Sequence, residues 1–221
     1  QVMSEGRKDA LLKAYDLYEY VYYFVVSFVY GVSASMILPF VSVYTKKYTD
    51  IHYVDVRLAI LFMVIGFANN MRVPSGTMIN AAGHFKETQW RAILEATINL
   101  TVSLILVKPL GMFGLLIGTV CSFAYRTTDI IYYSHKHILN ISCKKAVLRV
   151  IRTAFCIVGS ILLYRLIIDV YEVESWSKWI VYAIIDSCIT VLVVCSVNFI
   201  TEPKLFKDCV NMVVKKIKRK M

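Results

Sequence analysis

The chain has 221 residues, of which 58% are hydrophobic, and its formal net charge at pH 7 is +10. A mean hydropathy of +0.60 spread over several long apolar runs excludes a soluble globular domain and predicts an all-α integral membrane protein. Most of the positive charge lies in loops and tails beside these runs, where it sets topology and contacts anionic lipid, so we expect no nucleic-acid partner.

The first elements in chain order are a polar segment and an aromatic-ended span. Apolar residues at helical spacing predict a short amphipathic helix within residues 1–17, leading into a span at about 20–44. Ser27, Gly31 and Ser35 recur every four residues in this span. Such a stripe of small side chains lets another helix come close.

The second predicted span, at about 56–82, holds a polar segment at membrane depth. Its side chains include Asn69, Asn70, Arg72 and Asn80. Pro74 removes a backbone donor and clashes with the preceding turn, so we expect the helix to bend or open there and to leave carbonyls that need partners. Broken polar helices of this kind form binding sites in many transporters, and Arg72 is expected to face a central groove rather than lipid.

The next two predicted spans each carry one polar face. The third, at about 89–108, places Arg91, Glu95 and Asn99 four residues apart, so that Arg91 and Glu95 can pair with each other. The fourth, at about 112–135, has a polar stripe made of Thr119, Ser122, Arg126 and Asp129. Intramembrane charges usually face a protein interior or a cavity.

A basic loop follows at 135–145, and its two histidines are interpreted as solvated. The fifth span is predicted at about 152–171 and the sixth at 176–201. Asp186 lies near the middle of the sixth span, and Arg165 is its nearest candidate partner because an isolated carboxylate is costly at that depth. The tail, 202–221, is interpreted as a basic amphipathic helix on the membrane surface that binds anionic lipid.

The distribution of basic residues predicts the orientation. With both termini cytoplasmic, sixteen of the 25 lysines and arginines fall in inner segments and five in outer ones. The positive-inside rule favours this topology, a multi-pass protein with both ends of the segment in the cytoplasm.

Motifs for catalysis or metal binding are missing from the sequence. There is no HExxH, phosphate-binding loop, dinucleotide fingerprint or nucleophile elbow, and the six cysteines show no CxxC spacing. We therefore expect no enzyme activity, no cofactor and no metal site.

One long run carries a family resemblance. INAAGHFKETQWRAILEATINLTVSLILVKPLGMFGLLIGTVCSFAYRTTDIIYYSHKHIL resembles the C-terminal half of bacterial polysaccharide transporters, the oligosaccharide flippases of the multidrug, oligosaccharidyl-lipid and polysaccharide exporter superfamily. The shared features are an Asn-Ala-x-Gly-x-x-Lys turn, a helix with Glu and Asn, a short Gly-containing hairpin and a Gly-x-x-Ile-Gly-Thr helix. The resemblance spans about 58–139.

The resemblance implies a six-helix bundle that forms one lobe of a two-lobe flippase. Residues 1–17 are then the remnant of a cytoplasmic interlobe connection, 18–201 the C-terminal lobe and 202–221 the tail, while an N-terminal lobe is missing. The implied function is to flip an undecaprenyl-linked oligosaccharide across the bacterial cytoplasmic membrane by alternating access. Such a chain is expected not to flip its substrate alone.

Candidate substrate contacts follow from the chemistry of a lipid-linked pyrophosphate. Forked, charge-assisted hydrogen bonds make arginine suited to an anionic headgroup, and amides suit sugar hydroxyls. The candidates are Arg72, Arg126, Asn69, Asn70, Asn80, Asn99 and Glu95. The competing interpretation is that the arginines pair with Glu95, Asp129 or Asp186 and only hold helices together.

Three other functions remain as alternatives. A multispan enzyme of envelope assembly needs a large extramembrane loop or a cluster of catalytic carboxylates and histidines near one interface, whereas the longest predicted loops have only about ten residues. A noncatalytic membrane scaffold does not need buried arginines. A multidrug antiporter favours acidic cavity residues, against which the mid-span arginines argue.

Overall fold

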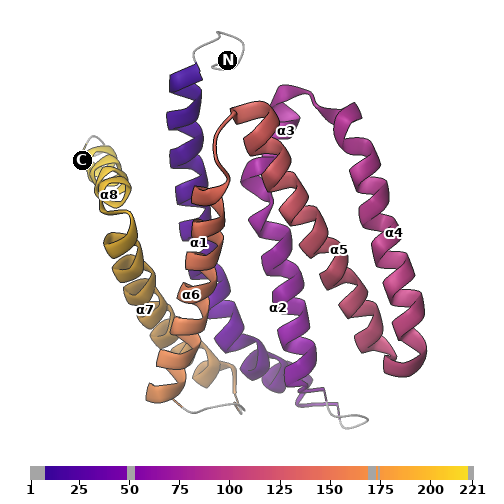
Figure 1. The fold of residues 1–221 in the computed structure, drawn as a ribbon. Coiled ribbons are helices and arrows are strands. Elements are labelled where there is room, and N and C mark those ends of the chain that lie inside the picture. Colours follow the sequence, from indigo (N-terminus) through magenta and orange to yellow (C-terminus); the bar gives the residue numbers. More distant parts are fainter. Residues whose placement is uncertain (1–7, 49–52, 169–172, 174, 219–221) are drawn as a thin grey trace. The chain divides into compact units, whose positions relative to one another are not determined.

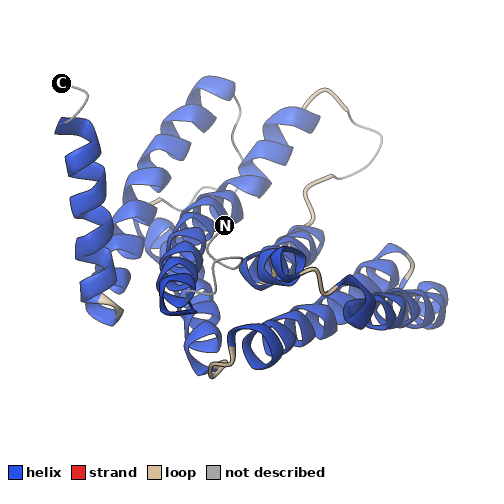
Figure 2. Cartoon of the chain, turned by 90° about the horizontal axis from the view of Figure 1, so that it is seen from above, coloured by secondary structure: helices blue, strands red, loops and turns tan. Residues whose placement is uncertain are grey.

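The structure is a computed structural model that describes residues 8–48, 53–168, 173 and 175–218. All secondary structure within these ranges is helical, and none of it is strand (Figures 1 and 2). The elements in order are α1 (Lys8–Thr45), α2 (Val56–Met71), α3 (Val73–Ala82), α4 (Phe85–Leu110), α5 (Met112–Tyr133), the π-helical segment η1 (Ser134–Leu139), α6 (Lys144–Ile167), α7 (Trp176–Thr201) and α8 (Pro203–Lys218).

Among the described residues, five helical segments are long and apolar enough to cross a membrane: α1, α2 together with α3, α4, α6 and α7. These segments identify the chain as a membrane protein. The fourth predicted span corresponds to α5, which has 22 residues but is not among the five. Arg126, Asp129 and several hydroxyl residues lower its hydropathy, so the six-span bundle stays a prediction.

Two predicted boundaries are wrong. The helix predicted within 1–17 is present over its described part but has no boundary with the first span, because α1 continues from Lys8 through Thr45 without a break. The loop predicted at 135–145 is largely helical, since η1 covers Ser134–Leu139 and α6 begins at Lys144. Good helix formers next to an apolar span extend that helix beyond the bilayer, whereas the prediction placed the boundary where the sequence becomes polar. The predicted bounds of α7 are confirmed.

The predicted break beside Pro74 is confirmed. Helix α2 ends at Met71 and α3 begins at Val73, with Arg72 between them. Pro74 has no N–H for the Asn70 carbonyl, which accepts instead from the Arg72 N–H. The carbonyl of Ala68 accepts a hydrogen bond of 2.7 Å from the Thr127 hydroxyl of α5. A side chain from a neighbouring helix thus satisfies backbone at the break.

At its other end, α2 begins with a side-chain cap. Asp55 Oδ1 accepts from the backbone N–H of Arg57 at 2.8 Å and from that of Leu58 at 3.4 Å. The Arg57 side chain donates to the same carboxylate and holds the pKa of Asp55 below its usual range. The cap satisfies two of the first N–H groups of α2.

The chain divides into two compact units. Unit 1 comprises 1–15 and 54–148, and unit 2 comprises 16–53 and 149–221. Within unit 1, α4 packs along α5 and α5 packs along α2 (Figure 1). Gly111, at φ 56°, turns the chain between α4 and α5. A Cβ on Gly114 would overlap the α4 backbone at Leu106, so α4 and α5 approach each other through backbone contact.

Unit 2 packs around small residues of α1. A Cβ on Gly31 would lie 2.7 Å from Cγ2 of Thr190 in α7 and 3.4 Å from Oγ of Ser160 in α6. The small-residue stripe predicted in the first span therefore does admit close neighbours. Next to this contact on the same three helices, Met36, Tyr164 and Ile189 form a buried apolar cluster.

We expect Gly114→Ala to destabilise the protein by about 1–3 kcal/mol, because the added methyl overlaps backbone that cannot rotate away. Gly76→Ala in α3 is the matched control, since its added Cβ meets nothing within 4 Å and alanine is the better helix former. Thermal unfolding in detergent, followed by circular dichroism, measures both. Equal melting temperatures for the two variants would contradict the close approach of α4 and α5.

Candidate functional site

Five charged side chains of unit 1 form a continuous chain of ion pairs, here called the ion ladder: Arg72, Glu95, Arg126, Asp129 and Arg91. Arg72 Nη1 lies 2.7 Å from Glu95 Oε1, and Arg126 Nε lies 3.4 Å from Glu95 Oε2. Arg126 Nη1 is 3.3 Å from Asp129 Oδ2, and Arg91 pairs with the other oxygen of Asp129. The ladder joins the α2–α3 break to α4 and α5.

Helical spacing brings the charged residues of α4 to one face and those of α5 to another. Arg126 and Asp129 are three residues apart on α5, and Arg91 and Glu95 are four apart on α4. Each pair therefore lies on one face of its helix. Arg91 and Glu95 do not bond each other as predicted, because Glu95 is taken by Arg72 and Arg126 while Arg91 reaches across to Asp129.

The ladder is only partly buried and carries one more cation than anion. Its side chains are between 11% and 31% exposed. Three guanidinium groups face two carboxylates, so one positive charge is left uncompensated within the ladder. The ring of Phe123 lies 4.8 Å from the Arg72 guanidinium carbon, and that of Tyr133 lies 4.8 Å from the Arg91 carbon. Aromatic faces stabilise arginines that have lost part of their hydration.

The predicted arginines and Glu95 thus meet in one place, together with Asn69. Arg72 Nη2 donates to Asn69 Oδ1 at 2.6 Å. Arg72 points at protein from α4 and α5, in keeping with the expectation that it turns away from lipid, while the groove stays a prediction. This arrangement also realises the competing interpretation, because Arg72 and Arg126 pair with Glu95 and Asp129.

The other predicted amides lie outside the ladder. Asn99 Nδ2 is 3.5 Å from the Thr119 hydroxyl, and its Oδ1 accepts from Ser103. The Asn70 amide donates to the Gly66 carbonyl of its own helix. Asn80 is exposed on α3. These three side chains do not converge with the arginines on a single point.

A second ion cluster lies in unit 2, and sequence reasoning missed it. This Arg149 cluster consists of Arg149, Arg152, Asp16, Glu19 and Glu202. Arg149 is only 1% exposed and contacts Asp16 and Glu19 at 2.8 Å and Glu202 at 3.0 Å. Arg152 Nη1 lies 3.4 Å from Glu202 Oε2. Three carboxylates here face two guanidinium groups, the reverse of the balance in the ion ladder.

The predicted orientation counts Arg149 among the sixteen basic residues of the inner segments. One feature of the sequence could have indicated this cluster. Asp16 and Glu19 are three residues apart and therefore lie on one face of α1. Their shared partner, Arg149, lies 133 residues from Asp16 and 130 residues from Glu19 in the chain. No local spacing indicates such a contact.

Asp186 is fully buried but is not paired with Arg165. Neither of its carboxylate oxygens has a hydrogen-bond partner within the described part of the chain, although the Ser35 hydroxyl lies close to it. Arg165 is exposed on α6, so the prediction that it pairs with Asp186 is wrong. A buried ionised carboxylate without a partner is very costly, so burial favours the protonated, neutral form of this group.

The histidines also differ in part from the prediction. His135, interpreted as solvated, is 1% exposed, and its Nδ1 bonds the Ile131 carbonyl at 2.9 Å. His84 Nδ1 lies 2.9 Å from the Tyr133 hydroxyl, and His137 stacks on the same ring. The described residues contain no group of three or more His, Cys, Asp or Glu side chains arranged to hold a metal.

We expect Glu95→Gln to destabilise unit 1 by about 1.5–3 kcal/mol, because two partly buried arginines lose a charged acceptor at once. The matched control is Arg57→Gln, which breaks an ion pair whose arginine is 76% exposed and which should leave the melting temperature unchanged. Thermal unfolding in detergent measures both variants. An unchanged melting temperature for Glu95→Gln would show that Glu95 does not hold the three elements together.

For unit 2 we expect opposite outcomes from two buried charged residues. Arg149→Gln should cost about 3–5 kcal/mol, because three carboxylates lose the cation that they share. Asp186→Asn should leave the melting temperature nearly unchanged, since the amide replaces a carboxyl group that is already neutral. Both variants can be compared in one detergent melt. A large loss for Asp186→Asn would mean that the carboxylate is ionised and paired.

Comparison with known proteins identifies no relative of this chain. No protein-family model matches it, and neither a curated protein nor a solved structure does. The flippase family therefore remains a prediction made from the residues.

Proposed function

We propose that this chain is part of a flippase that moves an undecaprenyl-linked oligosaccharide from the cytoplasmic to the outer leaflet of a bacterial cytoplasmic membrane. The observation that carries the proposal is the ion ladder, a partly exposed set of three arginines with one uncompensated charge, joined to apolar helices. Polar and ionisable groups at membrane depth usually mark the path of a substrate.

The pairing within the ladder suits a site that is alternately empty and loaded. While the site is empty, Glu95 keeps Arg72 and Arg126 neutralised among apolar helices. An arriving pyrophosphate offers the same guanidinium groups stronger, forked hydrogen bonds and displaces Glu95 from one of them. Asn69, already in contact with Arg72, lies close enough to bond the first sugar, while Asn99 and Asn80 would meet sugars farther along.

The main rival is a noncatalytic membrane scaffold, and one observation favours it. Each charged side chain of the ladder already has a partner within unit 1. A scaffold would need nothing more from these arginines. Only the loss of transport, with the fold kept, separates the two functions.

The proposed partners extend to the membrane itself. Helix α8 carries five lysines and one aspartate, and in this proposal it lies on the anionic cytoplasmic surface. An N-terminal lobe completes the transporter and supplies the other wall of the substrate path.

We expect the paired substitution Arg72→Gln with Glu95→Gln to abolish transport. The protein should still accumulate, because removing both charges leaves no unpaired charged group and Arg126 keeps its ion pair with Asp129. The matched control is Arg91→Gln with Asp129→Asn, which leaves Arg72, Arg126 and Glu95 in place. The assay expresses the gene that encodes this chain, together with the N-terminal lobe that the proposal requires, in a strain lacking its own flippase and measures surface polysaccharide. The first pair should reduce surface polysaccharide at least about tenfold, equivalent to about 1.4 kcal/mol.

Equal surface polysaccharide from the two paired variants, at equal protein abundance, would favour the scaffold. Failure of the unaltered gene to restore any polysaccharide would reject the flippase.

A further inference from the structure

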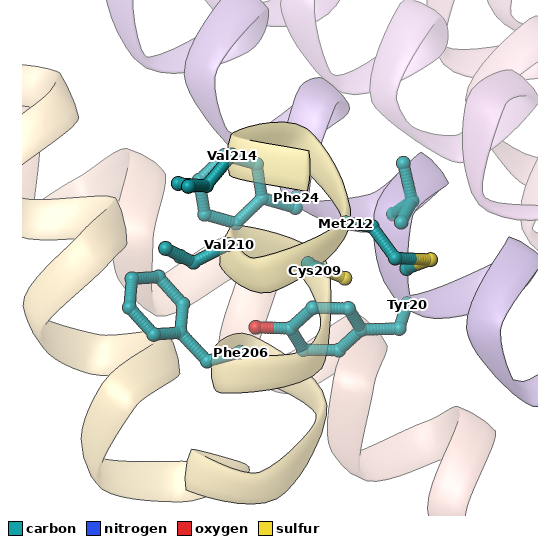
Figure 3. A pocket seen from close by; sticks show the side chains of 8 residues that line it. Tyr20, Phe24, Phe206, Cys209, Val210, Met212 and Val214 are labelled. Atoms are coloured by element: carbon teal, nitrogen blue, oxygen red, sulfur yellow. The ribbon is translucent and has the colours of Figure 1, made fainter. Parts of the chain in front are cut away.

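An apolar pocket in unit 2 lies between α1 and α8. Its volume is about 380 Å³, within the range of about 300–1,000 Å³ that small-molecule sites occupy. Val21 and Phe24 of α1 face Phe206, Val210 and Val214 of α8, as Figure 3 shows for most of these side chains. Hardly any polar surface lines the pocket, so its occupant must be apolar over most of its length.

One hydrogen-bond donor that lines this pocket, and a second donor that lies next to the first, have no partner among the described residues. The first is the hydroxyl of Tyr20, which lines the pocket and is 1% exposed. Figure 3 shows this hydroxyl directed to the side on which α8 lies. The second is Nη2 of Arg152, whose guanidinium carbon is 5.3 Å from the Tyr20 ring centre. Buried donors without acceptors are rare. The Tyr20 hydroxyl is placed to meet an acceptor supplied by a ligand in the pocket, and Arg152 lies beside the Tyr20 ring.

We propose that this pocket binds one acyl chain of an anionic membrane phospholipid, with the ester carbonyl of that chain accepting hydrogen bonds from Tyr20 and Arg152. The chain fills the apolar space between α1 and α8. The headgroup stays outside, among the exposed lysines of α8 such as Lys204 and Lys207. Helix α8 is thereby held to α1 through a bound lipid.

Charge explains why the acceptor is a carbonyl and the phosphate stays out. Arg152 belongs to the Arg149 cluster, where three carboxylates outnumber two guanidinium groups. A phosphate drawn into that cluster would be repelled, whereas a neutral ester oxygen would not. The lysines of α8 attract an anionic headgroup instead. Burial also raises the pKa of the Cys209 thiol beside the pocket, so this side chain adds no negative charge near the lipid.

This inference depends on α8 lying at the membrane and is independent of flipping. Its test therefore measures bound lipid rather than transport. The full chain is purified from nanodiscs that hold equal parts phosphatidylglycerol and phosphatidylethanolamine, and native mass spectrometry counts the lipids that remain bound in detergent. The unaltered chain should retain one phosphatidylglycerol in preference to phosphatidylethanolamine.

Tyr20→Phe should lower this retention roughly fivefold, as expected for one neutral hydrogen bond, without lowering the melting temperature of lipid-free protein. Tyr164→Phe is the matched control, because its hydroxyl is likewise buried without a partner but does not line the pocket. It should leave retention unchanged. Equal retention by the two variants would overturn the role of Tyr20.

Val210→Trp should fill the pocket and abolish retention, whereas Val181→Trp on the exposed face of α7 should not. Lys204→Gln with Lys207→Gln should remove the preference for phosphatidylglycerol over phosphatidylethanolamine and keep one lipid bound. Retention unaffected by Val210→Trp would overturn the pocket as the site. Equal retention of the two lipids by the unaltered chain would overturn the anionic headgroup.

Discussion

The neutralisation of arginine inside apolar helices is the constraint on which unit 1 depends. Glu95 accepts from Arg72 at the break between α2 and α3 and from Arg126 on α5, so one carboxylate joins three elements. The hydrophobic effect alone does not select these contacts, because lipid tails are as apolar as leucine side chains. Charge pairing and the close approach of α4 and α5 at Gly114 therefore determine which helices meet.

Buried charges are also paired in unit 2, but there the carboxylates outnumber the arginines. Arg149 gathers carboxylates from α1 and from the residue that precedes α8, and it is more deeply buried than any arginine of the ladder. Asp186 has no ion-pair or hydrogen-bond partner within the described part of the chain, so its burial favours the neutral carboxyl group. In both units a buried charge is therefore neutralised. Most charges are neutralised by an ion pair, and for Asp186 burial favours protonation.

The flippase proposal and the lipid-pocket proposal both depend on polar groups whose charge or hydrogen bonds are not fully matched within the protein. The ladder keeps one surplus positive charge and some exposure, which an anionic headgroup can exploit at the expense of Glu95. The pocket beside α8 has the unsatisfied hydroxyl of Tyr20 among apolar side chains, with Arg152 beside the Tyr20 ring, which suits an ester carbonyl at the head of an acyl chain. A binding site in a membrane protein needs this kind of residual polarity, because a fully satisfied and fully buried network has nothing to offer a ligand.

Composition and periodicity by themselves determined that the chain is a helical membrane protein, that the helix breaks beside Pro74, and that charges share faces at Arg91–Glu95 and Arg126–Asp129. These properties are local, since they follow from hydropathy, from a missing backbone N–H and from 3.6 residues per turn. Only the tertiary structure decided that Glu95 bonds Arg72 and Arg126 instead of Arg91. It likewise decided that Arg149 is buried among Asp16, Glu19 and Glu202, and that Arg165 does not pair with Asp186. Where a side chain has several possible partners of suitable charge, the packing of the helices determines which one it contacts. That packing depends on distant segments, so no single segment of the chain predicts it.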